Sequence, residues 1–190
     1  MTKAAAAVLA AVLGLGLSRL PDGGAAGVAR AQQAAAQTLP AGWTEVKWPF
    51  PIDQWGTGRA FRCPAADCGA ALDLYLRPKL GFCNCTTGVA DDPELDRVGD
   101  LELFSASFSG LREGRPVKVG WMRGRSRPYE VAIPRGGART MLAIAFNDKC
   151  DVVVATAVAD RDQLDAAERA ALAFLNGDLV LRWAKRELGL

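Results

Sequence analysis

Five cysteines are the residues of this chain with the clearest capacity for chemistry. Four of them lie within 23 residues and the fifth lies far downstream: Cys63, Cys68, Cys83, Cys85 and Cys150. A group of this density could form structural disulfides, a thiolate metal site or a redox centre. The chain contains no histidine, which excludes Ser-His-Asp and Cys-His catalysis and removes the commonest metal ligand.

The spacing of the cysteines favours structural disulfides for four of the five. Cys63 and Cys68 flank a predicted turn between two strands, where the chain ends lie close together. Cys150 begins a predicted central strand, so its partner comes from a distant segment, and Cys83 and Cys85 are both available. Either choice leaves one thiol of the Cys83-Asn84-Cys85 segment unmatched.

That unmatched thiol leaves a second interpretation open. A C-x-C pair can exchange a disulfide with a third cysteine, and Cys83 with Cys85 could hold a soft metal such as Cu(I). No C-x-x-C occurs, so neither a thioredoxin-type motif nor a haem attachment site is present. We expect structural disulfides without metal or cofactor, and keep thiol redox work or copper handling as the alternative.

The N-terminus has the three parts of a secretory signal peptide. Lys3 precedes an apolar run over residues 4–17, and Ala29-Arg30-Ala31 provides a small-residue cleavage site. The run is shorter than the stretch of about 20 residues that crosses a bilayer, so we expect no membrane span. We predict a cleaved signal peptide over residues 1–31, a flexible leader over 32–41, one domain over 42–190 and a periplasmic location.

Residue patterns along this domain predict an antiparallel sheet followed by two helices. Period-2 and continuous apolar patterns predict strands, and helical spacing with Asp162 and Asp178 as caps predicts the two C-terminal helices. A short helix capped by Asp92 is expected to end near Gly99. The predicted strands cover an edge segment after Trp43 and residues 59–63, 72–76, 117–121, 129–133, 141–146 and 152–158.

Two predicted turns determine the expected arrangement. Asn147-Asp148 joins the last two strands into a central hairpin buried on both faces, and residues 124–127 form a polar tip between the strands at 117–121 and 129–133. The sum is an α+β domain with two C-terminal helices packed on one face of the sheet. This order of elements resembles the small sandwiches of the PsbP and Mog1 type, although no sequence motif carries the resemblance and no family is assigned.

Arginines provide a candidate contact surface. On the predicted tip, Arg123, Arg125 and Arg127 project together, while Arg135 and Arg139 flank Gly136-Gly137 in another loop. Such groups suit carboxylate or phosphate ligands or an acidic protein surface. The alternative is that they balance the acidic stretch before them, which comprises Asp91, Asp92, Glu94, Asp96, Asp100 and Glu102.

The net charge and the tryptophans limit the classes of ligand that we expect. Removing residues 1–31 takes three of 23 basic and one of 21 acidic residues, and the resulting balance of 20 and 20 disfavours general binding to nucleic acid. Trp43, Trp48 and Trp55 could form a sugar-stacking platform or an interface anchor, but their spacing among prolines favours packing over the sheet.

We therefore predict a non-enzymatic periplasmic accessory or binding protein. Its partner would be another periplasmic protein or a small anionic ligand, contacted through the arginine tips and the Cys-rich loop. A carboxylate-based hydrolase is a remote alternative, and the sequence leaves the oligomeric state open.

Overall fold

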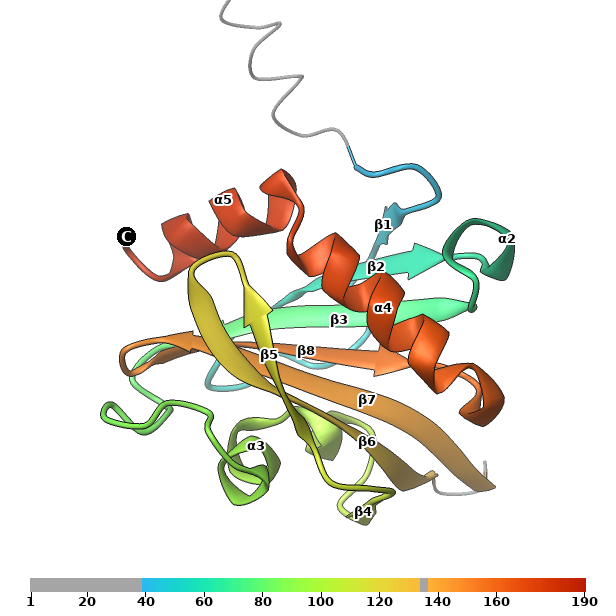
Figure 1. Ribbon diagram of the computed structural model, residues 1–190, viewed down its shortest axis with the longest axis horizontal. Coiled ribbons are helices and arrows are strands. Elements are labelled where there is room, and N and C mark those ends of the chain that lie inside the picture. Colours follow the sequence, from blue (N-terminus) through green and yellow to red (C-terminus); the bar gives the residue numbers. More distant parts are fainter. Residues whose placement is uncertain (1–38, 134–136) are drawn as a thin grey trace, which may run out of the picture. The chain divides into compact units, whose positions relative to one another are not determined.

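The computed structural model describes residues 39–133 and 137–190, and in them it shows an eight-stranded antiparallel sheet with helices on both faces (Figure 1). The sheet order is β1-β2-β3-β8-β7-β6-β4, and β5 also pairs with β6. The strands are β1 Thr44–Val46, β2 Arg59–Cys63, β3 Leu72–Lys79, β4 Phe108–Gly110, β5 Arg115–Val119, β6 Met122–Ile133, β7 Gly137–Asp148 and β8 Asp151–Val158. The predicted signal peptide and residues 32–38 of the predicted leader lie outside the described residues.

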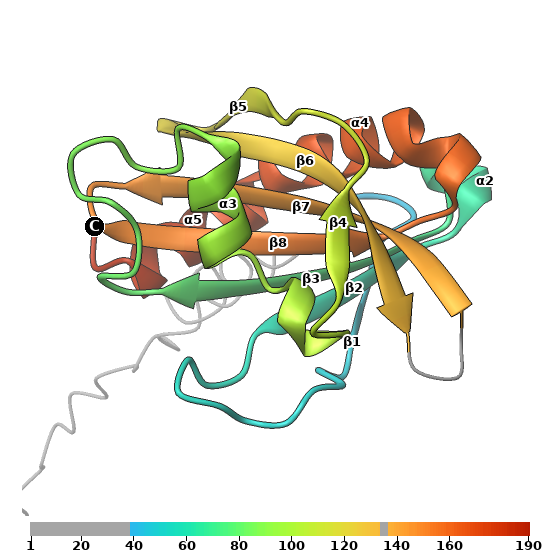
Figure 2. The ribbon, with the colours of Figure 1, turned by 90° about the horizontal axis from the view of Figure 1, so that it is seen from below.

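Helices cover the two faces unequally. α4 (Leu164–Leu175) and α5 (Asp178–Glu187) lie across one face, and the single-turn helix α2 (Ala65–Cys68) lies near the end of α4 (Figure 1). On the opposite face, which Figure 2 presents, lie α3 (Asp92–Val98) and the 3-10 turn Leu101–Leu103. Another 3-10 turn, Arg161–Gln163, leads into α4. The predicted α+β class, with two C-terminal helices on one face of an antiparallel sheet, is confirmed.

The predicted central hairpin of β7 and β8 is also confirmed, and it is buried on both faces. Leu142, Ile144 and Phe146 belong to the core under α4 and α5, whereas the alternate residues Ala143 and Ala145 belong to the core under α3. Because successive side chains of a strand point to opposite faces, both sides of this hairpin must be covered by apolar groups. The domain therefore has two apolar cores with the sheet between them.

The turn between β5 and β6 lies four residues before the predicted tip. Gly120 and Trp121 form it, with Val119 opposite Met122, and Gly120 has a φ of 57° that few residues other than glycine adopt. The predicted tip, residues 124–127, instead lies within β6. Gly124 faces the backbone of β7, and a Cβ at this position would lie 1.9 Å from the carbonyl oxygen of Ala145.

The other corrections concern turns and caps. Lys149 and Cys150, not Asn147 and Asp148, connect β7 to β8, and Lys149 has a φ of 53°. Asp91, not Asp92, caps α3, because its Oδ1 accepts the Glu94 N–H at 2.8 Å.

The C-terminal helices form where they were predicted, but their first residues differ. Asp162 lies in the preceding 3-10 turn and Gly177 precedes α5, so neither Asp162 nor Asp178 provides a side-chain cap. Within residues 39–133 and 137–190, no helix combines the length and the apolar character that crossing a membrane takes.

The position of Gly124 inside the sheet can be tested by substitution. Gly124→Ala should lower the free energy of unfolding by about 1–3 kcal/mol, because the added methyl group meets β7 backbone. Ala132→Ser, at an exposed position of the same strand, should change it by less than about 0.5 kcal/mol. Urea unfolding of both variants measures this difference. Equal stability of Gly124→Ala and the unmodified protein would place Gly124 in an open turn.

Candidate functional site

The structure joins four of the five cysteines in two disulfides. Cys63 pairs with Cys68 across α2, and Cys85 pairs with Cys150 over a sequence separation of 65 residues. Cys83 is the one free cysteine among the described residues, and it is buried. The first pair is the predicted one, and the structure settles which residue of the Cys83-Asn84-Cys85 segment bonds to Cys150.

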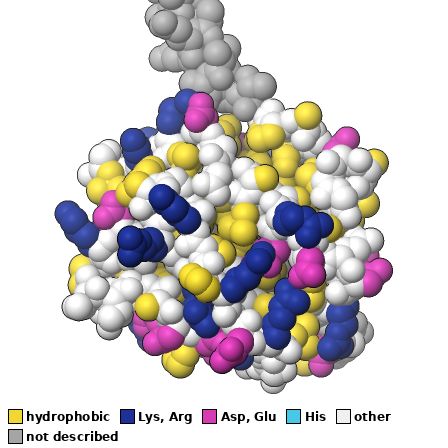
Figure 3. Space-filling view, viewed as in Figure 1, with side chains coloured by type: hydrophobic (Ala, Val, Ile, Leu, Met, Phe, Trp, Pro, Cys, Tyr) yellow, Lys and Arg dark blue, Asp and Glu magenta, His cyan; other side chains and the backbone are white. Residues whose placement is uncertain are grey.

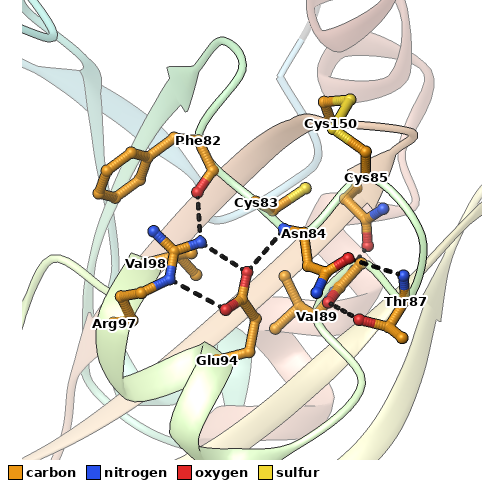
Figure 4. Close-up of polar contacts among 12 residues, drawn as sticks. Phe82, Cys83, Asn84, Cys85, Thr87, Val89, Glu94, Arg97, Val98 and Cys150 are labelled. Carbon is orange, nitrogen blue, oxygen red and sulfur yellow. Dashed lines mark hydrogen bonds and ion pairs between the residues drawn. A yellow bond between two sulfur atoms is a disulfide. The ribbon is translucent and has the colours of Figure 1, made fainter.

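The Cys-rich loop, residues 81–90, is tied to α3 by polar contacts (Figure 4). Arg97 on α3 donates to the carbonyl oxygen of Phe82 at 2.6 Å, and Glu94 accepts the Asn84 N–H at 2.8 Å. Arg97 and Glu94 also pair with each other at 2.7 Å. The loop is thus fixed at one point by a disulfide and at two others by side chains of a single helix.

Cys83 lies where a thiol is least reactive. Its Sγ donates to the carbonyl oxygen of Lys149 at 3.2 Å, and only 6% of the residue is exposed. Burial, and after it the charges of Glu94 and Asp151, raises the pKa of Cys83 to about 11. The thiolate is the nucleophile and the metal ligand, so this environment suppresses both activities near neutral pH.

The described side chains are not arranged to bind a metal ion. In the described part of the chain, no three His, Cys, Asp or Glu side chains are grouped so as to hold a metal ion. Cys85, one of the two ligands in the copper alternative, is engaged in the disulfide to Cys150.

Two of the predicted contact arginines are used inside the domain. Arg125 and Arg127 on β6 reach α3, where Arg125 Nε pairs with Asp92 and Arg127 Nη1 lies 3.1 Å from both Asp96 carboxylate oxygens. The Tyr129 hydroxyl donates to Asp96 as well. These contacts attach α3 to the sheet and correspond to charge balance between the basic and acidic stretches.

Arg123 has a different environment, near the start of β6 and beside the Cys-rich loop. It is exposed, and it lies directly opposite Lys118 of the neighbouring strand β5, so that two like charges face each other. Lys149 is exposed in the β7–β8 turn, and Lys185 on α5 completes the group. None of these four cations forms an ion pair within the described residues. Like charges directly opposite each other on neighbouring strands destabilise a sheet, so the Lys118–Arg123 pair lowers the stability of the isolated domain.

Trp121 lies in the β5–β6 turn, where it lines one hollow together with Arg123 and Lys149. It is 39% exposed, its Nε1 donates to Asp148 at 2.8 Å, and the Lys185 ammonium lies 5.0 Å from its ring. We call Lys118, Trp121, Arg123, Lys149 and Lys185 the Trp121 surface. On the side seen in Figure 3, Lys and Arg side chains lie scattered among hydrophobic, acidic and other side chains.

A hollow of about 330 Å³ connects this surface to the Cys-rich loop. It is lined by Cys85, Thr86, Thr87, Gly88, Trp121, Arg123, Asn147, Asp148 and Lys149. The structure therefore brings Arg123 and Cys85 together, two residues that were singled out in different parts of the sequence. The Trp121 surface also includes Trp121, Lys149 and Lys185, which the sequence patterns did not mark. For Trp121 the reason is that the turn was expected at residues 124–127.

The other predicted contact arginines do not belong to this surface. Arg139 lies in β7 opposite Val131, eight positions along β6 from Arg123, or about 26 Å at strand spacing. It lines a separate hollow of about 710 Å³ at the far end of the sheet. Arg135 lies outside the described residues.

Of the three N-terminal tryptophans, two pack within the domain and the third lies at its surface. Trp43 packs on Phe174 with ring centroids 4.2 Å apart, and Trp48 lies edge-on to Phe50 at 5.2 Å, so both have the packing role that was expected. Trp55 packs against Phe82 with ring centroids 4.6 Å apart and the rings tilted by 54°, and it stays partly exposed.

Removal of the disulfides should separate their contributions. The chain-entropy model predicts a loss of about 4 kcal/mol for Cys85→Ser/Cys150→Ser and about 2 kcal/mol for Cys63→Ser/Cys68→Ser, because the loops differ in length. Urea unfolding of the two double variants measures the order. A larger loss for the Cys63/Cys68 pair would show that the Cys-rich loop is not anchored through Cys150.

The attachment of α3 to the sheet should weaken at acidic pH. Burial alone would raise the pKa of Asp92, but hydrogen bonds from Arg125 and Gly114 outweigh it and hold that pKa below its ordinary value of 3.8. A depressed pKa contributes stability that is present above the unfolded value and lost as the pH falls through the folded value. Asp92→Asn should therefore be less stable than the unmodified protein at pH 7.

The stability difference between the unmodified protein and Asp92→Asn should shrink as the pH drops below about 4. Unfolding by urea across that range measures it, with Glu113→Gln, at an exposed position, as control. A difference that stays constant with pH would mean that the Asp92 charge does not hold α3.

No family model and no curated protein matches the chain. Among solved structures it is similar to LpqN of Mycobacterium tuberculosis, described as involved in cell envelope biogenesis, with 15% identity, a TM-score of 0.41 and coverage of 74% of this chain and 79% of that one. It is also similar to the cyanobacterial PsbP (CyanoP) of Synechocystis sp. PCC 6803, with 12% identity, a TM-score of 0.44 and coverage of 72% and 79%. Likeness at this level assigns no function to the chain.

Proposed function

We propose that this chain is a non-enzymatic accessory protein of the periplasm that binds an acidic segment of another exported protein through the Trp121 surface. One observation carries the proposal: the β5–β6 hairpin, the β7–β8 turn and α5 carry four exposed cations without ion-pair partners in the described structure, next to an exposed tryptophan and a loop fixed by a disulfide. Counted with Asp148, the group has a net charge of +3 at neutral pH, from four basic and one acidic side chain.

Two features support a location outside the cytoplasm. Disulfides persist in oxidising compartments, and the domain has two of them, one of which spans 65 residues. The N-terminal sequence has the pattern of a secretory signal peptide.

The physical chemistry of the surface suits a protein partner. Tryptophan and arginine are enriched among the residues that dominate binding energy, and complementary charges raise the rate of association. The Lys118–Arg123 opposition weakens the isolated domain, and an acidic partner would relieve it. The tie to α3 and the disulfide limit the ordering that binding would otherwise require.

The redox alternative has less support. Disulfide exchange needs an accessible thiolate, whereas Cys83 is buried with a raised pKa and Cys85 is already bonded to Cys150. The roles of the cysteines that follow from this arrangement are structural.

Site-specific photocrosslinking in cells that express the protein tests the proposal. A crosslinking amino acid at Thr87, in the hollow, should form an adduct with a protein whose linked segment is rich in Asp and Glu. Arg123→Glu/Lys149→Glu should reduce that adduct about tenfold or more, because it reverses the charge of the surface. The same crosslinker at the exposed Ala173 on α4 serves as control.

Arg169→Glu, an exposed charge reversal on α4, should leave the Thr87 adduct unchanged. An adduct that survives Arg123→Glu/Lys149→Glu, or a yield at Thr87 no higher than at Ala173, contradicts the proposal. Saturable binding of citrate to the surface without a protein adduct would assign it to small anions instead.

A further inference from the structure

A second hollow, on the α3 face, has the composition of a small-molecule site and is not used by the proposed function. It encloses about 510 Å³, within the range of about 300–1,000 Å³ typical of ligand pockets. We call it the Trp55 recess. Its lining comprises Asp53, Gln54, Trp55, Arg77, Lys79, Phe82, Arg97, Gly99, Asp100, Glu102 and Leu103.

Three charged side chains form the base of the recess and are almost fully buried. Arg77 donates through Nε and Nη2 to the two Asp100 carboxylate oxygens at 2.6 and 2.7 Å. Lys79 lies 2.8 Å from Asp100 and donates to the carbonyl oxygen of Val98 at 2.7 Å. Replacing buried ion pairs by apolar side chains is often neutral or stabilising, so stability alone does not explain this group.

The buried arginine positions the aromatic wall of the recess. Arg77 Nη1 donates to both carboxylate oxygens of Asp53 at 2.7 Å, and Asp53 Oδ1 accepts the Trp55 N–H at 2.8 Å. The Gly56 N–H donates to the Asp53 carbonyl oxygen at 3.0 Å and closes the turn. A chain of charge-assisted contacts thus runs from β3 to the backbone of Trp55, and the Trp55 indole packs against Phe82.

The charged side chains already present around the recess disfavour charged ligands. The lining has three basic and three acidic side chains, and Glu94, which pairs with Arg97, adds a fourth acid, so the group carries a net charge of −1. A cationic ligand would compete with the Lys79 ammonium, which already lies 5.3 Å from the Phe82 ring and 5.8 Å from the Trp55 ring. An anionic ligand would meet the exposed Glu102.

The hydrogen-bonding groups left over suit hydroxyl groups. Gln54, Glu102 and the Trp55 indole N–H have no partner among the described residues, and 37% of the Asp53 side chain is exposed. Carboxylates accept hydrogen bonds from hydroxyls, and the amide of Gln54 can both donate and accept. The negative face of an indole attracts the weakly positive C–H groups of a sugar ring.

We propose that the Trp55 recess binds a neutral hexose-based saccharide. Its ring stacks on Trp55, its hydroxyls donate to Glu102 and Asp53, and the Arg77–Asp53 contact keeps the Trp55 backbone in place. The proposal is independent of the Trp121 surface, since the two sets of residues do not overlap.

Calorimetric titration with neutral trisaccharides tests this inference. The probes are trimers of α-linked glucose, β-linked glucose and N-acetylglucosamine, added to the folded, disulfide-bonded protein at millimolar concentrations. We expect saturable binding of at least one trimer and a loss of affinity of about tenfold or more in Trp55→Ala, as for removal of a central aromatic contact. Trp121→Ala should bind as the unmodified protein does.

Glu102→Gln keeps the test decisive if Trp55→Ala disturbs the fold, because Glu102 is exposed and its side chain forms no hydrogen bond or ion pair within the described structure. It should weaken binding several-fold, since a neutral amide accepts hydrogen bonds less strongly than a carboxylate. The proposal fails if none of the three trimers binds, or if binding is the same in Trp55→Ala and Glu102→Gln as in the unmodified protein.

Discussion

Burial of the β7–β8 hairpin on both faces is the constraint on which the rest of this domain depends. Leu142 and Phe146 point to one face and Ala143 and Ala145 to the other, so each face needs an apolar cover of its own. α4 and α5 provide one cover by ordinary amphipathic packing. The second cover is smaller, because α3 has only seven residues and offers few apolar side chains.

That short helix is held by charge and by covalent linkage as well as by apolar contact. Asp92 and Asp96 pair with arginines of β6, and Arg97 and Glu94 fix the Cys-rich loop, which the Cys85–Cys150 disulfide ties to the β7–β8 turn. The same arrangement explains the exposed cations. Arg123, Arg125 and Arg127 point to one face of β6, but the acids of α3 reach only the last two, which leaves Arg123 to the Trp121 surface.

Much of the fold could be predicted from the sequence, because it follows from local patterns. The alternation in β3 and the continuous apolar runs of β7 and β8 identify the strands, and helical spacing identifies α4 and α5. Turn positions were less predictable. Residues 124–127 have turn-like composition, yet Gly124 is required by close approach to β7 backbone, which only the paired sheet reveals.

The candidate sites depend on contacts between distant segments and were harder to predict. β3 extends beyond its predicted end and includes Arg77 and Lys79. Basic residues at these positions do not indicate burial in the sequence, because the acids that pair with them, Asp53 and Asp100, come from distant segments. The pairing of Arg125 and Arg127 with acids some 30 residues earlier likewise depends on where α3 packs.

Peptide mapping of the protein alkylated without reductant tests the central claim most directly, namely that the cover of α3 and the Cys-rich loop is anchored through Cys85 and Cys150 around a buried Cys83. The account predicts two linked peptide pairs, Cys63 with Cys68 and Cys85 with Cys150, and modification of Cys83 only after unfolding. A linked Cys83, or rapid modification of Cys83 in the folded protein, would contradict it and restore the redox interpretation of the loop.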